Sequence, residues 1–111
     1  MSGEFYTRRE RIIEILESSD KPLTVEEIAY ALGLRSFSRR ELENDIAHVI
    51  MTIKRRGFAK VKIISPQCID CGYVFPRKRE SVRKPSKCPR CGSHRIIGPW
   101  FKIVRKRSPG P

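Results

Sequence analysis

The chain has 111 residues, which is enough for one ordinary domain or for a small domain that carries an insertion. Its formal net charge of +12 and its sequence pI of about 10.2 indicate a polyanionic partner. No apolar run has transmembrane length, and the N-terminal segment has no apolar signal-peptide core, so we expect a cytoplasmic protein with no membrane partner.

Three helices are predicted in the first half of the chain, each opened by a capping box. In this motif a Ser or Thr and a Glu three residues later bond the free backbone amides at a helix start. The three boxes begin at Thr7, Thr24 and Ser38, and each is followed by apolar residues at helical spacing. Gly33 and Gly57 are expected to end the second and third helices.

The order of these helices is that of a helix-turn-helix, because residues 33–37 join a short helix to a longer one. Two strand-like segments follow. Residues 59–63 alternate with period two, and residues 100–104 are rich in aromatic and β-branched side chains. Three helices followed by two strands are the layout of a winged helix, with the strands paired as the wing. A generic three-helix bundle is the alternative that the pattern leaves open.

Two C-x-x-C-G knuckles lie between these strands, at residues 68–72 and 88–92. Four thiolates at this spacing predict a tetrahedral metal site, and the gap between the knuckles is that of a zinc ribbon. The expected ligands are Cys68, Cys71, Cys88 and Cys91. Structural Zn²⁺ is the favoured cofactor, and iron in the same site is a minor alternative.

Other interpretations of the knuckles carry less weight. Disulfides are the alternative in a secreted chain, but nothing in the sequence indicates secretion. His94, three residues after Cys91, is an alternative ligand, but four cysteines already complete the shell. A complete shell also leaves no open position for catalysis, and the sequence has no catalytic motif, so we expect no enzyme.

The predicted fold class is therefore α+β. It is a winged helix-turn-helix, with three helices and a two- or three-stranded wing sheet, and a zinc ribbon is inserted between the wing strands. Residues 1–64 and 99–107 form the winged helix-turn-helix, residues 65–98 form the ribbon, and residues 108–111 form a flexible tail.

Positive charge is concentrated in the second half of the chain. Residues 1–64 contain 12 Lys and Arg against 10 Asp and Glu, whereas residues 65–111 contain 12 against 2. One Zn²⁺ with four thiolates adds a charge of −2 and leaves the second half near +8. This imbalance favours phosphate binding over an ordinary solvated surface.

Candidate nucleic-acid contacts are cationic or base-reading side chains that are expected to point outward. They are Arg39, Arg40, Asn44, His48 and Arg55 on the third helix, Lys60, Lys62 and Lys102 on the strands, and Arg77, Lys78, Arg79, Arg83 and Lys84 between the knuckles. Glu41, Glu43 and Asp45 flank the outward face of the third helix and would repel phosphates. A solvated amphipathic helix with no role in base reading is therefore an equal alternative. Trp100 either stacks on a partner or covers the seam between the modules.

The chain resembles a known family at these motifs. Its helix-turn-helix, LTVEEIAYALGL followed by SRRELENDIAHVI, is similar to that of winged-helix transcription regulators. Its knuckles, CIDCGYVF and CPRCG, are similar to those of the rubredoxin-like zinc ribbon. Together they resemble archaeal transcriptional regulators in which a winged helix-turn-helix carries such a ribbon. The resemblance implies zinc on the four cysteines and a role in transcription.

The leading hypothesis is a DNA-binding transcription regulator. Its partner would be double-stranded DNA, with phosphate contacts from the ribbon loop and tail and base reading by the third helix. The alternative is a protein-interaction module that docks on the transcription or translation machinery. Electron transfer by iron is a third, lesser hypothesis. No long extra helix offers a dimer interface, so a monomer is expected.

Overall fold

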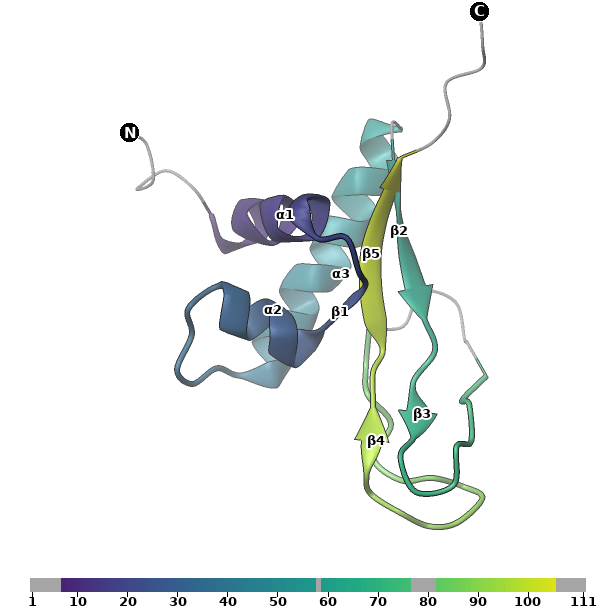
Figure 1. The fold of residues 1–111 in the computed structure, drawn as a ribbon. Helices are drawn as coiled ribbons and strands as arrows, with labels where there is room; N and C mark the ends of the chain where they lie inside the picture. The colour runs from purple at the N-terminus through teal and green to yellow at the C-terminus, as the bar shows by residue number, and fades with distance from the viewer. Residues whose placement is uncertain (1–6, 58, 77–81, 106–111) are drawn as a thin grey trace, which may run out of the picture.

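The computed structural model describes residues 7–57, 59–76 and 82–105. Three helices lie against one face of a small sheet, and a second, two-stranded sheet extends from its end (Figure 1). The elements are α1 (Arg8–Ser18), β1 (Leu23–Thr24), α2 (Val25–Ala31), α3 (Arg39–Arg56), β2 (Ala59–Ile64), β3 (Gln67–Cys68), β4 (Ile96–Ile97) and β5 (Trp100–Arg105). The fold is thus mixed α and β, as the sequence predicts.

All three helices begin at the predicted caps. The Oγ of Thr7 accepts from the amide of Glu10 (3.1 Å), and the Glu10 carboxylate accepts from the amide of Thr7 (3.0 Å). Thr24 forms the same reciprocal box at the start of α2. Ser38 accepts from the amide of Glu41 (3.2 Å) and caps α3, but the reciprocal bond of the predicted box is found at Thr7 and Thr24 and not at Ser38. The other end of α3 is Gly57, whose positive φ of 82° lets its amide reach the carbonyl of Ile53.

The two predicted strands pair directly. β2 and β5 are antiparallel, with Val61 opposite Ile103 and Ile64 opposite Trp100. β1 pairs with the other edge of β5, so β5 is the central strand of a three-stranded sheet in the order β1-β5-β2. Although β1 lies near the start of the chain, it is held by a strand near its end.

The main core lies between the helices and this sheet. The apolar side chains at helical spacing in α3 are buried, namely Leu42, Ile46, Val49, Ile50 and Ile53. Phe101 of β5 is also fully buried and is among the largest side chains of this core. Because Phe101 follows the knuckles in sequence, the helical core contains residues from both sides of the metal-binding segment.

The ribbon is inserted between β2 and β5. The chain leaves β2 through Pro66 into β3, and it returns from β4 through Gly98 and Pro99 into β5 (Figure 1). At this joint Gly98 has a φ of 100°, and a Cβ there would lie 2.9 Å from the Trp100 ring and 3.0 Å from the Cα of Pro66. The Trp100 ring therefore packs on the joint, as in the second of its two predicted roles.

A further contact ties the ribbon to the helices. Val82, which lies between the two knuckles in sequence, is only 8% exposed and belongs to the main core rather than to the ribbon core. From the sequence, this part of the chain was expected only to supply basic side chains for phosphate contacts. In the structure the loop is anchored, because one apolar side chain among its charges enters the core.

None of the helices within the described residues combines the length and apolar character that a bilayer crossing requires.

We predict that Val82→Ala lowers the free energy of unfolding of the helical core by about 1–2 kcal/mol, because two buried methyl groups are lost. Val74→Ala is the matched control, since Val74 also belongs to the ribbon but is 54% exposed, and it should cost less than about 0.5 kcal/mol. Urea unfolding followed by far-UV circular dichroism measures both. Equal effects of the two substitutions would show that Val82 does not anchor the loop.

Candidate metal centre and basic groove

The four cysteines of the knuckles converge at the end of the ribbon. Their Sγ atoms all lie within 4.8 Å of one another. Two cross-knuckle pairs, Cys68 with Cys91 and Cys71 with Cys88, are each separated by 3.6 Å. Zinc–sulfur bonds of about 2.3 Å in a tetrahedron give sulfur–sulfur distances of about 3.8 Å. The arrangement therefore fits one tetrahedral Zn²⁺ with a closed shell.

The two knuckles repeat the same backbone geometry. In the first, the amide of Gly72 donates to the carbonyl of Cys68 (2.9 Å), and the amide of Cys68 donates to the carbonyl of Tyr73 (2.8 Å). The second knuckle repeats both bonds at the same lengths. Gly72 and Gly92 have φ values of 79° and 78°, which side chains with a Cβ rarely adopt. The glycine in each C-x-x-C-G motif is thus required by the turn.

Backbone amides favour the thiolate form at one ligand in particular. Burial disfavours the charged form of Cys88, but the amides of Cys91 and Arg90 and the neighbouring thiol of Cys71 outweigh it and lower the pKa to about 7. The Arg90 amide lies 3.3 Å from this sulfur. The amide of Ser93 lowers the pKa of Cys91, but burial and the three other thiols outweigh that effect and raise it to about 12. Four thiolates at this spacing therefore require a cation.

His94 takes no part in this cluster. Among the described residues, the group of potential ligands at the site consists of the four cysteines. The Nδ1 of His94 instead lies 2.9 Å from the carbonyl oxygen of Ser86. The alternative in which His94 replaces a cysteine therefore has no support in the geometry.

The ribbon has its own small apolar core next to the metal site. Cys68, Cys88 and Ile96 are buried together, and Tyr73 and Phe75 pack against them. The two aromatic rings meet edge to face, with centroids 5.1 Å apart and planes at 80°.

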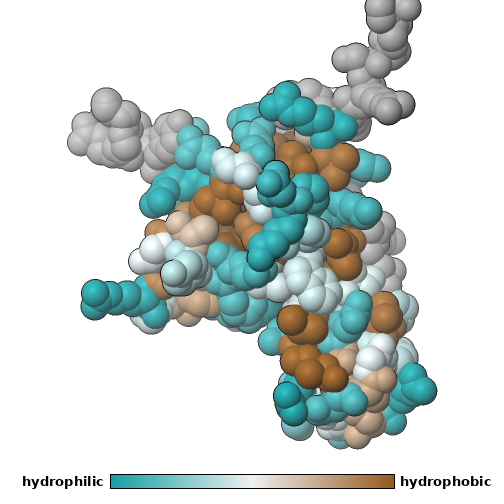
Figure 2. Space-filling model, viewed as in Figure 1, coloured by the Kyte–Doolittle hydropathy of each residue, from teal (hydrophilic) through white to brown (hydrophobic). Residues whose placement is uncertain are grey.

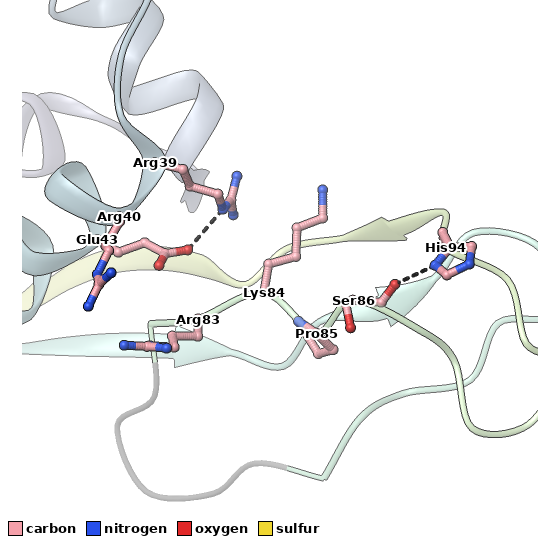
Figure 3. A pocket seen from close by; sticks show the side chains of 8 residues that line it. All are labelled: Arg39, Arg40, Glu43, Arg83, Lys84, Pro85, Ser86 and His94. Atoms are coloured by element: carbon pink, nitrogen blue, oxygen red, sulfur yellow. Dashed lines mark hydrogen bonds and ion pairs between the residues drawn. The ribbon is translucent and has the colours of Figure 1, made fainter.

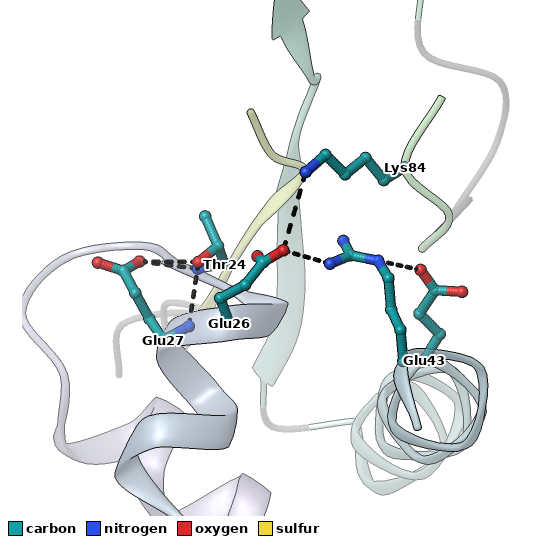
Figure 4. A network of polar contacts seen from close by, with 6 residues as sticks. Thr24, Glu26, Glu27, Glu43 and Lys84 are labelled. Atoms are coloured by element: carbon teal, nitrogen blue, oxygen red, sulfur yellow. Dashed lines mark hydrogen bonds and ion pairs between the residues drawn. The ribbon is translucent and has the colours of Figure 1, made fainter. Parts of the chain in front are cut away.

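An ion-pair network links the ribbon to the helices (Figure 4). The Arg39 guanidinium bonds Glu43 (2.8 Å) and Glu26, and the Nζ of Lys84 lies 3.8 Å from the same Glu26 oxygen, Oε2. Burial alone would raise the pKa of Glu26, but a backbone hydrogen bond and the charges of Arg39 and Lys84 outweigh it and lower the pKa. α2, α3 and the ribbon thus meet at one carboxylate.

The acidic residues near the start of α3 are largely paired within the fold. Glu43 is buried against Arg39, and Asp45 pairs with both Arg8 and Arg9 of α1. Glu41 remains exposed. The predicted repulsion between α3 and phosphates is therefore reduced, since two of its three sources are neutralised locally.

A groove of about 610 Å³ lies between the start of α3 and residues 83–86 of the ribbon (Figure 3). It is lined by Arg39, Arg40, Glu43, Arg83, Lys84, Pro85, Ser86 and His94. Four of these side chains are cationic and one is acidic, so the groove favours an anionic ligand.

The predicted nucleic-acid contacts fall into four groups. On α3, Arg40, Asn44, His48 and Arg55 are exposed, whereas Arg39 is tied into the ion-pair network. On the sheet, Lys60, Lys62 and Lys102 share one face, and the Nζ of Lys102 donates to the carbonyl of Ser19 (3.2 Å). Arg83 and Lys84 line the groove. Arg77, Lys78 and Arg79 lie outside the described residues.

Two residues that join the ribbon to the helices, Glu26 and Val82, were not predicted from the sequence. Neither has a local signal, because the partners of Glu26 are 13 and 58 positions away and Val82 stands alone among charged residues.

We predict that Cys88→Ser abolishes stoichiometric zinc binding and unfolds the ribbon, while most of the helical circular dichroism remains at about 25 °C. The reason is that α1, α2, α3 and the β1-β5-β2 sheet form a core of their own, although loss of the Val82 anchor should lower its melting temperature. Elemental analysis and far-UV spectra measure the two effects. His94→Ala should keep one zinc per chain, and loss of the helical signal in Cys88→Ser would contradict a separate helical core.

Comparisons with known proteins agree with this architecture. Residues 7–61 match the family described as PF0610-like, N-terminal, and residues 65–106 match the PF0610 rubredoxin-like zinc β-ribbon domain. The solution NMR structure of protein PF0610 from Pyrococcus furiosus is similar to the chain, with 33% identity, a TM-score of 0.73, and coverage of 96% of this chain and 94% of that one. None of the curated proteins matches the chain significantly. The ribbon match and the four converging cysteines support structural zinc. This chain therefore belongs to the PF0610-like family, in which an N-terminal domain is followed by a rubredoxin-like zinc β-ribbon.

Proposed function

We propose that the protein is a non-enzymatic, DNA-binding transcription regulator with a winged helix-turn-helix arrangement. In this proposal α2 and α3 are the helix-turn-helix, β2 and β5 are the wing, and the zinc ribbon replaces the wing tip. The observation that carries the proposal is the outer face of α3, which is exposed along the helix while two of its acidic neighbours are neutralised by ion pairs.

The exposed face of α3 has side chains suited to the major groove. Asn44 can bond adenine in a bidentate manner, and Arg40, one turn earlier, can bond guanine or a phosphate. Arg8 and Arg9 form ion pairs with Asp45. Their effect on DNA binding would therefore be indirect, because they neutralise a negative charge on α3.

The sheet adds a second basic surface. Lys60 and Lys62 are exposed on one face of β2, at alternate positions, and Lys102 lies opposite Lys62 on β5. Like charges placed directly across two strands repel, and the bond from Lys102 to the carbonyl of Ser19 draws its ammonium toward the end of α1. Lys60 and Lys62 are then the side chains of this face best placed for phosphates.

The metal site has a structural role in this proposal. Four thiolate ligands leave no open coordination position, so zinc would hold the two knuckles together and take no part in a reaction. The chain's own residues then set the position of the ribbon relative to α3 through Trp100, Val82 and Lys84.

A second candidate function is docking on a protein of the transcription or translation machinery. Figure 2 shows apolar side chains gathered over β4 on one face of the ribbon. Ile69 and Ile97 are 53% and 40% exposed, and both line a groove of about 340 Å³ that Trp100 also borders. Exposed apolar side chains beside such a groove are typical of protein contacts.

We predict salt-sensitive binding to duplex DNA, with a log–log slope of about −0.9 for each phosphate neutralised. Lys60→Gln and Lys62→Gln should each make this slope shallower by about 0.9 on any duplex. Asn44→Ala should weaken only a preferred genomic sequence, by about 1–3 kcal/mol, and leave random duplexes unaffected. Fluorescence anisotropy between 50 and 300 mM salt, roughly the range over which phosphate contacts weaken, measures all three.

Arg11→Gln is the matched control, since it removes one charge from an exposed position of α1 to which the proposal assigns no DNA contact. The absence of salt-sensitive binding to any duplex would refute the DNA-binding proposal. The docking candidate predicts instead a protein partner that survives nuclease treatment of a lysate and is lost on Ile97→Asp.

A further inference from the structure

We propose that the groove between α3 and the ribbon is a site for a backbone phosphate of nucleic acid, and that Glu26 occupies its two key cations in the free protein. This inference rests on the proposed DNA binding and deepens it. It assigns a direct phosphate contact to the ribbon, and it gives Glu26 the role of an internal competitor.

The charges of the groove come from two distant parts of the chain. Arg39 and Arg40 belong to the first turn of α3, and Arg83 and Lys84 belong to the segment that returns through the ribbon (Figure 3). Glu43 is the one acidic side chain in the lining, and it is already bonded to Arg39. A polyanion entering the groove would therefore meet a net positive surface on both walls.

Glu26 lines the neighbouring groove beside Trp100, and it shows how an anionic oxygen is held by two of the cations that line this one. A single carboxylate oxygen, Oε2, contacts both the Arg39 guanidinium and the Lys84 ammonium (Figure 4). One anionic oxygen between two cations from two modules is also the arrangement that a phosphate oxygen requires. Because the Glu26 side chain is 51% exposed, it can rotate into solvent without leaving a buried charge behind.

The guanidinium of Arg39 has capacity for a further acceptor. Its Nε and Nη1 are used by Glu43 and Glu26, whereas its Nη2 is buried and has no hydrogen-bond acceptor among the described residues. A buried donor left without a partner costs free energy. A phosphate that takes the place of Glu26 can offer this donor an additional oxygen once the Glu26 side chain has moved away. Arginine also suits phosphate better than lysine, since its planar group bonds two oxygens at once.

Exchange of Glu26 for phosphate would change what holds the ribbon. In the free protein Lys84 is tied to α2 through Glu26. In the complex Lys84 and Arg39 would both bind the phosphate, so the ribbon and α3 would hold the nucleic acid between them. The ion pair to Glu26 is then a cost of binding, and its removal should strengthen the complex.

Glu26→Gln against Glu27→Gln is the decisive comparison, because both remove one negative charge from the first turn of α2. Glu27 caps its helix through Thr24, and glutamine can replace it in that role. We expect Glu26→Gln to tighten duplex binding by about three- to fivefold more than Glu27→Gln at about 100 mM salt. Lys84→Gln should weaken binding by a similar factor relative to Lys87→Gln, whose position is exposed and outside the groove.

The outcomes separate this inference from the proposed function. If the wild type binds duplex DNA but the two variants of each pair bind it with equal affinity, the groove is excluded as a phosphate site while the DNA-binding proposal stands. If Glu26→Gln binds more weakly than Glu27→Gln, Glu26 supports the site and does not compete with phosphate, which also overturns the inference. If wild type binds no duplex, both proposals fail. Far-UV circular dichroism of all four variants serves as the control that each variant is folded.

Discussion

The pairing of β2 with β5 is the constraint on which the rest of the structure depends. β5 lies at the centre of the sheet, between β1 and β2, and places Phe101 inside the helical core. Every residue of the ribbon must therefore fit between two neighbouring strand ends. This requirement excludes a long extended insertion and favours a compact unit whose two ends lie side by side, which the antiparallel β3 and β4 supply.

The metal site lets a short segment meet this requirement. The ribbon buries only Cys68, Cys88 and Ile96 with two aromatic side chains beside them, which is too small a core to fold without support. Zinc on four thiolates provides that support, because its binding free energy becomes folding free energy. Val82, the Trp100 joint and the Lys84–Glu26 pair then fix the ribbon against the helices, so that the insertion does not swing freely.

Whether a feature could be predicted depends on how far apart in the sequence its interacting residues lie. The helices were predicted from Thr7, Thr24 and Ser38 because a cap and its partner are three residues apart, and the ribbon was predicted because each knuckle is local. The strand pairing followed from pattern and order. The ion pairs of Glu26 and the burial of Val82 could not be predicted, since they exist only once the ribbon has folded back onto α2 and α3.

The same folding back determines where the positive charge of the protein is available. Two acidic residues of α3, Glu43 and Asp45, are paired inside the fold with Arg39 and with Arg8 and Arg9. The sites that decide phosphate affinity are therefore set by tertiary pairing and not by the count of charges. A cation already paired with a carboxylate gains less from a phosphate than an unpaired one, because the first interaction must be given up. For a chain with a net charge of +12, such internal pairing would limit indiscriminate binding to polyanions. A duplex that engages α3, the sheet lysines and the groove together would compensate for the loss of the Glu26 pairs, whereas a polyanion that reaches the groove alone would not.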